Sequence, residues 1–263
     1  MKEKVDLYNN TYGNFTDRVL AEVRAEAFGK DIGQNSWITA QEMLMLIEPL
    51  RLNDDSVVLE VACGSGGPAM FLAKSTRCKI HGVDSNENAI QTARNQSSRT
   101  EIHFEVADAN QQLPFEEGKF DSIVCMDAVN HFCDRFQILR EWHRLLKKGG
   151  RFLYTDPIVI TGPLTNDEIA KRSSIGFFVL VPQGANEKWI EDAEFRLIEK
   201  HDVTSAAAAI AKRWCDARAK RQTDLESLEG KERFEGLQTF LDVVHRLYSE
   251  KRLSRFAYIG EKI

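Results

Sequence analysis

The sequence predicts an α/β protein with a doubly wound, mostly parallel seven-stranded sheet and a helical cap inserted before the last strand. Short apolar runs alternate with helical patterns over most of the chain, which is typical of repeated strand–helix units. The first run is apolar throughout, as expected for a strand buried on both faces. A glycine-rich loop, residues 64–67, follows this run and lets a small ligand approach the backbone closely.

The N-terminal residues 1–50 read as helices and loops, and the last of these helices stops near Pro49. Apolar, β-branched runs predict the strands, which are expected at residues 57–62, 79–83, 102–107, 120–126, 151–155, 195–203 and 254–260. Helical periodicity and cap residues predict the intervening helices at residues 68–74, 87–95, 134–148 and 189–194. Pro68 is tolerated in a first helical turn, Asp134 is a suitable N-cap, and Gly149-Gly150 ends the longest of these helices.

Two insertions interrupt the alternation of strands and helices. Residues 161–185 mix turn residues with apolar ones, and residues 204–250 keep one apolar face for about four helical turns near their end. We expect both insertions to cap a substrate site, and we expect residues 1–50 to close it from the other side. The open alternative for 204–250 is an outer layer that only stabilises the sheet or a dimer.

Composition narrows the functional class. The 263 residues carry a net charge of −5, which argues against a nucleic-acid partner. No apolar run reaches the about 18 residues of a membrane span, and the N-terminus lacks the apolar core of a signal peptide. The five cysteines have no metal-ligand spacing, so we expect reduced thiols, no metal site and a cytoplasmic protein. The chain is expected to be a single domain, either a monomer or a homodimer.

The glycine loop alone does not identify a ligand. Gly64-x-Gly66 followed by Asp84, at the end of the second strand, suits a nicotinamide dinucleotide as well as another nucleoside. Glu60, at the end of the first strand, favours an ammonium group and would repel a pyrophosphate. Asp108, at the end of the third strand, suits an adenine amino group. For each acidic residue the alternative is a helix cap or a solvated loop.

Five motifs between residues 55 and 160 carry a family resemblance, namely EVACGSG at 60–66, VD at 83–84, ADA at 107–109, LPF at 113–115 before FD at 120–121, and LKKGGR at 146–151. On these motifs the sequence resembles the class I S-adenosylmethionine-dependent methyltransferases. GGPA at 66–69 resembles the group of sarcosine/dimethylglycine, tocopherol and sterol methyltransferases, and DIGQNSW at 31–37 is similar to the sarcosine/dimethylglycine methyltransferases. Ala62 departs from the pattern, because the family usually has its first glycine there.

The resemblance implies a Rossmann-like fold, S-adenosyl-L-methionine as cofactor and a small-molecule acceptor. The residues that it assigns to the cofactor are Trp37, Glu60, Gly64, Gly66, Asp84, Asp108, Ala109 and Met126. Whether methylation is at nitrogen, oxygen or carbon stays open. The alternatives are a nicotinamide-dependent oxidoreductase and a non-catalytic cofactor-binding protein.

The catalytic candidates are His131 and Asp127, which follow the fourth strand, where open α/β sheets place active residues. A neutral histidine can serve as general base. The candidates for binding the substrate are Asn130, Asp156, Phe177, Arg213 and Trp214. The alternatives are that His131 packs on the following helix and that Arg213 lies on a solvated basic face.

Overall fold

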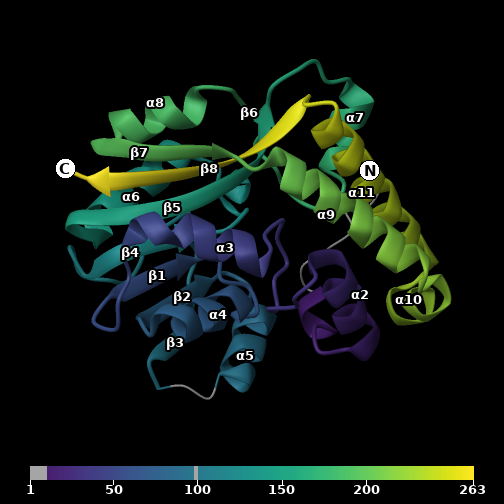
Figure 1. Ribbon diagram of the computed structural model, residues 1–263, viewed down its shortest axis with the longest axis horizontal. Coiled ribbons are helices and arrows are strands. Elements are labelled where there is room, and N and C mark those ends of the chain that lie inside the picture. Colours follow the sequence, from purple (N-terminus) through teal and green to yellow (C-terminus); the bar gives the residue numbers. More distant parts are fainter. Residues whose placement is uncertain (1–10, 98–99) are drawn as a thin grey trace.

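Eight strands form one sheet in the order β3-β2-β1-β4-β5-β8-β7, with the short β6 paired to β5. The computed structural model describes residues 11–97 and 100–263 (Figure 1). The strands span β1 Val57–Val61, β2 Lys79–Asp84, β3 Ile102–Val106, β4 Phe120–Cys125, β5 Leu146–Ile160, β6 Val181–Pro182, β7 Phe195–Asp202 and β8 Leu253–Lys262. All pairings are parallel except that β8 runs antiparallel to β5 and β7. The predicted α/β fold with a mostly parallel sheet is confirmed, and the two-residue β6 adds a strand to the seven expected.

Helices cover both faces of the sheet. The helices of the described chain span α2 Arg18–Phe28, α3 Ala40–Ile47, η1 Glu48–Leu50, α4 Gly67–Thr76, α5 Glu87–Gln96, η2 Val129–His131, α6 Arg135–Leu145, α7 Asn166–Arg172, α8 Ala185–Asp192, α9 Thr204–Ala219, α10 Gln222–Glu229 and α11 Lys231–Ser249. Along β1, Val58 packs with α3, α4 and α5, whereas Leu59 packs with α6 and α8 on the opposite face. This alternation explains why the strand is apolar at successive positions.

The insertion at 204–250 forms three helices that pack with the N-terminal α2. In Figure 1, α2 lies beside α9 and α10, at the end of the molecule opposite the C-terminus. Phe28 of α2, Ile210 of α9 and Phe240 of α11 belong to one apolar cluster that is separate from the two sheet faces. Arg221 adds ion pairs to Glu22 and Glu26 across the same contact. The N-terminal segment and the insertion therefore form one helical layer.

The boundaries of α6 and β5 differ from the expected ones. The helix ends at Leu145, because Leu146 already pairs with Phe120 in the sheet. The strand then continues to Ile160, with an irregularity between Asp156 and Val159 where it pairs with β8.

The segment 161–185, which the sequence suggests is loop material, contains the short helix α7. Its N-terminus is a capping box in which the Thr165 hydroxyl accepts from the Glu168 N–H and the Glu168 carboxylate accepts from the Thr165 N–H. This helix places Arg172 in the wall of a pocket that residues of α9 and α11 also line.

Candidate functional site

A cleft runs along the carboxyl ends of β1 to β4, where the parallel strands end at one edge of the sheet. We call it the strand-end cleft. It consists of a cavity of about 540 Å³ beside β2 and β3 and a smaller one of about 40 Å³ at the glycine loop. The two cavities share Tyr12, Asn35, Ala62 and Met126 in their walls. Six of the eight residues predicted to bind the cofactor line this cleft: Glu60, Gly64, Asp84, Asp108, Ala109 and Met126.

The other two predicted cofactor residues lie elsewhere. Gly66 does not line the cleft, and a Cβ built on it would lie 2.5 Å from the Phe104 ring. With its positive φ of 76°, this glycine is required by the turn and by packing against β3, rather than by the approach of a ligand. Trp37 is buried and lines the neighbouring pocket under the cap. The N-terminal residues that do reach the cleft include Tyr12 and Asn35, which sequence reasoning missed because no spacing links them to the glycine loop.

Ala62 adopts a left-handed conformation with φ of 57°. An L-residue pays about 1–2 kcal/mol for this conformation, and glycine costs about 0.5–1 kcal/mol of additional chain entropy. We therefore expect Ala62→Gly to raise the free energy of unfolding by about 0.5–1 kcal/mol in urea denaturation, at an unchanged m-value. The matched control is Ala206→Gly on the exposed side of α9, which should lose about 1 kcal/mol. A loss in both variants would contradict the strain at Ala62.

Glu60 lies at the base of the cleft and is 2% exposed. Its Oε2 has no hydrogen-bond partner within residues 11–97 and 100–263. Burial, together with the nearby charge of Asp84, raises its pKa to about 8. A buried acid with an unpartnered oxygen beside a cavity is suited to receive a cation, because a cation would restore the ionised form.

Asp84 and Asp108 support the cleft in different ways. The Asp84 carboxylate accepts from the Gly64 N–H at 2.9 Å and from the Asn86 N–H at 2.9 Å. Burial raises its pKa, although these bonds favour the charged form. Asp108 is exposed and accepts from the Asn110 N–H at 2.9 Å. Asp84 therefore holds the glycine loop, and both carboxylates border the larger cavity.

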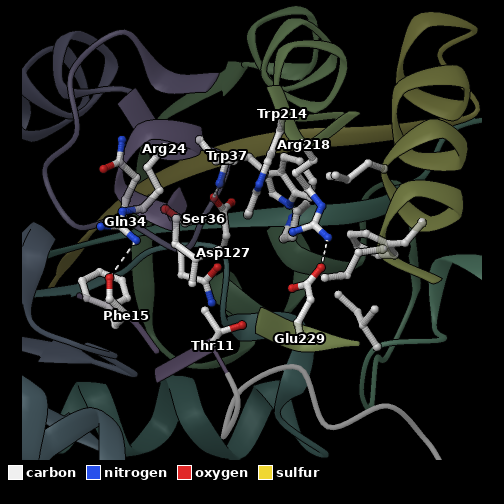
Figure 2. Close-up of a pocket in the computed structure, with 18 of the residues that line it drawn as sticks. Thr11, Phe15, Arg24, Gln34, Ser36, Trp37, Asp127, Trp214, Arg218 and Glu229 are labelled. Carbon is white, nitrogen blue, oxygen red and sulfur yellow. Dashed lines mark hydrogen bonds and ion pairs between the residues drawn. The ribbon is translucent and has the colours of Figure 1, made fainter. Parts of the chain in front are cut away.

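A second, mainly apolar pocket lies under the helical cap. We call it the cap pocket. It has a volume of about 90 Å³ and shares Asn35, Asp127, His131 and Ile175 with the larger cavity of the strand-end cleft. Aromatic rings form much of its wall, contributed by Phe15, Trp37, Phe178, Trp214 and Phe240. Figure 2 shows Trp37 and Trp214 on the same side of this pocket, with Arg218 paired to Glu229. The four shared residues mark where the two cavities meet.

His131 stands at this junction. Its Nδ1 lies 2.7 Å from the carbonyl oxygen of Phe177. A carbonyl only accepts, so Nδ1 carries a proton and, in the neutral ring, Nε2 is an acceptor. Burial lowers the pKa to about 4, helped by the charges of Arg172 and Arg135. The ring is therefore neutral near pH 7, with one fixed tautomer.

A family profile described as a methyltransferase domain matches residues 52–224. The chain belongs to this family. A methyltransferase of Streptomyces halstedii is 32% identical over 169 residues, which are 60% of this chain and 59% of that protein. A sarcosine/dimethylglycine N-methyltransferase of Halorhodospira halochloris is 35% identical over 111 residues, which are 41% of this chain and 40% of that protein. The matches thus span only about half of these relatives, and they confirm the predicted family resemblance.

The fold of this methyltransferase domain is shared with solved structures. The phosphoethanolamine N-methyltransferase 2 of Haemonchus contortus, in complex with S-adenosyl-L-methionine, superposes with a TM-score of 0.81 at 19% identity. The superposition covers 95% of this chain and 60% of that one. At this identity the similarity establishes the Rossmann-like fold.

Asp127 of the methyltransferase domain is held in a buried network. Its carboxylate accepts from the Trp37 N–H and from the Arg255 Nε, each at 2.7 Å, and its own N–H donates to the Thr155 hydroxyl. Arg255 also pairs with Glu42 of α3. Both Asp127 oxygens are therefore engaged, and this residue positions the junction instead of offering an open base.

The predicted substrate residues separate into two groups. Asn130 and Trp214 line the cap pocket, and Phe177 lines the strand-end cleft. Asp156 lines neither cavity, because it is buried in an ion pair with Arg135 and accepts from the Asn186 side chain. Arg213 donates to the Ala27 carbonyl at 2.7 Å and also lies outside both.

Proposed function

We propose that the protein transfers a methyl group from S-adenosyl-L-methionine to a small-molecule acceptor bound in the cap pocket. The observation that carries this proposal is the buried carboxylate of Glu60 beside the glycine loop, whose Oε2 has no hydrogen-bond partner among the described residues. A nicotinamide dinucleotide would bring a pyrophosphate to this loop, and Glu60 would repel it. The methionine end of S-adenosylmethionine brings an ammonium group, which matches the acid.

The remaining carboxylates of the strand-end cleft fit the rest of the cofactor. Asp84 would accept from the ribose hydroxyls, while Asp108 with Ala109 would hold the adenine. The Haemonchus contortus relative of the same fold binds S-adenosyl-L-methionine, which supports this assignment. When bound, the cofactor supplies a methyl group that its sulfonium already activates. The protein then mainly needs to align the acceptor, and orientation of this kind contributes about 7–11 kcal/mol.

The junction residues would align the acceptor. His131, neutral and held through Nδ1 by the Phe177 carbonyl, presents Nε2 as acceptor for an N–H or O–H of the nucleophile. Asp127 positions this region through Trp37 and Arg255. The cap helices and the segment 1–50, of which residues 1–10 lie outside the described residues, would close over the pocket and exclude water.

Calorimetric titration with S-adenosylmethionine and with NADH tests the cofactor assignment. We expect saturable binding of the first and none of the second. Release of S-adenosylhomocysteine in the presence of a panel of small amines, phenols and organic acids then tests turnover. Binding without turnover over the panel would favour a non-catalytic cofactor-binding protein, whereas preferential binding of NADH would overturn the proposal.

Cofactor affinity is expected to rise with pH up to about pH 8. Because the pKa of Glu60 is raised to about 8, below that pH binding of an ammonium must release a proton from this acid. The limiting slope is about tenfold per pH unit. Calorimetry at pH 7 in two buffers of different ionisation enthalpy should detect proton release in the wild type and none in Glu60→Gln. An affinity that does not change between pH 6 and 8 would argue against an ammonium at Glu60.

The cellular setting belongs to the same proposal. We propose a cytoplasmic enzyme without a nucleic-acid partner, supported by five free cysteines and a net charge of −5. Among the described residues, no helix is both long and apolar enough to cross a bilayer.

A further inference from the structure

The cap pocket contains a buried arginine without a counter-ion. Arg172, the last residue of α7, lines the pocket and is 1% exposed. Within the described part of the chain, no carboxylate forms a salt bridge with it, and its Nε and Nη1 have no hydrogen-bond partner. Its remaining contacts are a hydrogen bond with Tyr248 and the faces of Phe178 and Phe240, at 4.8 and 5.0 Å from Cζ. A buried charge in this state is costly to the folded protein.

The other charges around the pocket are already compensated. Arg24 pairs with Asp31 at 3.0 Å, and Arg218 pairs with Glu229. Arg255 is shared by Asp127 and Glu42, and Glu229 is also approached by Arg233 at 3.7 Å, so the excess charges of these two networks cancel. Arg172 therefore leaves the pocket with one excess positive charge among the described residues.

Asn130 adds a second unsatisfied group to the same wall. Its side chain is fully buried and lines the cap pocket, and in the described part of the chain neither its Oδ1 nor its Nδ2 has a hydrogen-bond partner. Leaving both ends of a buried amide unpaired costs free energy, which a bound polar ligand would recover. A guanidinium and an amide N–H in one enclosed pocket are donors suited to a carboxylate.

Arg172 would bind the carboxylate of a ligand at some distance from the ligand atom that receives the methyl group. The Phe178 ring lies 4.7 Å from the His131 ring, centroid to centroid, and 4.8 Å from the Arg172 Cζ. His131 borders both cavities, whereas Arg172 lines only the cap pocket. An anion at Arg172 would thus lie within the cap pocket, whereas methyl transfer would take place at the junction that His131 borders.

We propose that the methyl acceptor is a small carboxylic acid whose carboxylate is bound by Arg172 and Asn130, while a different atom of the molecule accepts the methyl group. This inference rests on the proposed function, because it names the acceptor class for the same site. A monoanion balances the single excess charge, whereas a phosphate dianion would leave one charge unpaired in an apolar pocket. The bound carboxylate would also offset the charge of Arg172, which otherwise opposes protonation of His131.

The test uses the protein loaded with S-adenosylhomocysteine and four probes: acetate, benzoate, the neutral isostere benzamide, and inorganic phosphate. Binding is followed by calorimetry and by ligand-observed NMR. We expect saturable binding of at least one carboxylate and weaker binding of benzamide. Arg172→Met should lower the affinity for the carboxylate by about tenfold or more, because a charge-assisted bond is lost, while Arg172→Lys should retain part of it.

Two controls separate binding from folding. Arg140→Met, which removes an exposed arginine of α6, should bind all probes like the wild type. The melting temperature of Arg172→Met should not fall, because the substitution removes an uncompensated buried charge. A lower melting temperature with unchanged carboxylate binding would assign Arg172 a structural role through its aromatic contacts and overturn the proposal.

The remaining outcomes are also decisive. Arg172-dependent binding of phosphate in preference to both carboxylates would overturn the carboxylate assignment, and so would equal binding of benzamide and benzoate. Absence of saturable binding by either carboxylate would overturn it as well. Failure to bind S-adenosylhomocysteine would instead refute the proposed function, and the probe titrations on the unloaded protein would still report on Arg172.

Discussion

Replacing His131 with asparagine is expected to lower the turnover rate by about 10²–10⁴-fold, the usual contribution of a general base. An asparagine amide can still donate to the Phe177 carbonyl, which now accepts from Nδ1 at 2.7 Å. The asparagine side chain has no hydrogen-bond acceptor at the position of Nε2. The proton that leaves the substrate during methyl transfer would therefore have no base to bind to. Cofactor affinity should stay near that of the wild type. The measurement is steady-state release of S-adenosylhomocysteine at saturating cofactor, with any acceptor that the panel yields.

The matched control is His245→Asn on α11. The Nδ1 of His245 also lies within hydrogen-bond distance of a carbonyl, that of Ala208 at 3.0 Å, but its ring lines neither cavity. This variant should turn over like the wild type. Equal rates in both variants would show that His131 only packs against its neighbours.

The pH profile gives an independent check on His131. Because burial lowers its pKa to about 4, the ring stays neutral and able to accept a proton down to well below pH 6. The rate at saturating cofactor should therefore show no inflection at the ordinary histidine pKa of about 6.5, and should fall only as the pH approaches 4. An inflection near 6.5 that disappears in His131→Asn would contradict the effect of burial.

Replacing Arg255 with methionine is expected to lower the free energy of unfolding by about 3–5 kcal/mol, the usual cost of breaking a buried ion pair. Arg255 is fully buried and pairs with both Asp127 and Glu42. Burial already raises the pKa of Glu42, and Arg255 opposes that shift through its charge and its hydrogen bond. The variant would leave two carboxylates buried without a cation. Urea denaturation at pH 7 measures the loss.

Two further variants separate the charge from the packing. Arg255→Met combined with Glu42→Gln and Asp127→Asn removes all three charges and should recover part of the loss. Arg196→Met removes an arginine that is 64% exposed and pairs with Glu261, so it should cost about 0–1 kcal/mol. A loss in Arg255→Met no larger than in Arg196→Met would show that the network contributes little.

The alternation of apolar strands with amphipathic helices was enough to predict the order along the chain of the seven longer strands. It was also enough to predict the cleft, because parallel strands place Glu60, Asp84 and Asp108 at one edge whatever the details of packing. Local signals failed where neighbouring elements decide the outcome. α6 ends early because Leu146 joins the sheet opposite Phe120. α7 was missed, although its capping box at Thr165 and Glu168 is a local signal that predicts a helix.

The sequence by itself determined the fold class, the family and the strand-end carboxylates Glu60, Asp84 and Asp108, since these depend on the repeated strand–helix pattern. It did not determine the N-terminal residues Tyr12 and Asn35 of the same cleft. Only the tertiary structure decided which charged side chains are paired. Asp127 forms an ion pair with Arg255, and Asp156 forms one with Arg135, each across a long separation in the sequence. Arg172, by contrast, has no carboxylate partner among the described residues. Ion pairs between residues far apart in the sequence have no fixed spacing, so a sequence pattern cannot predict them. The proposed acceptor class therefore rests on contacts that form only when the cap packs against the sheet.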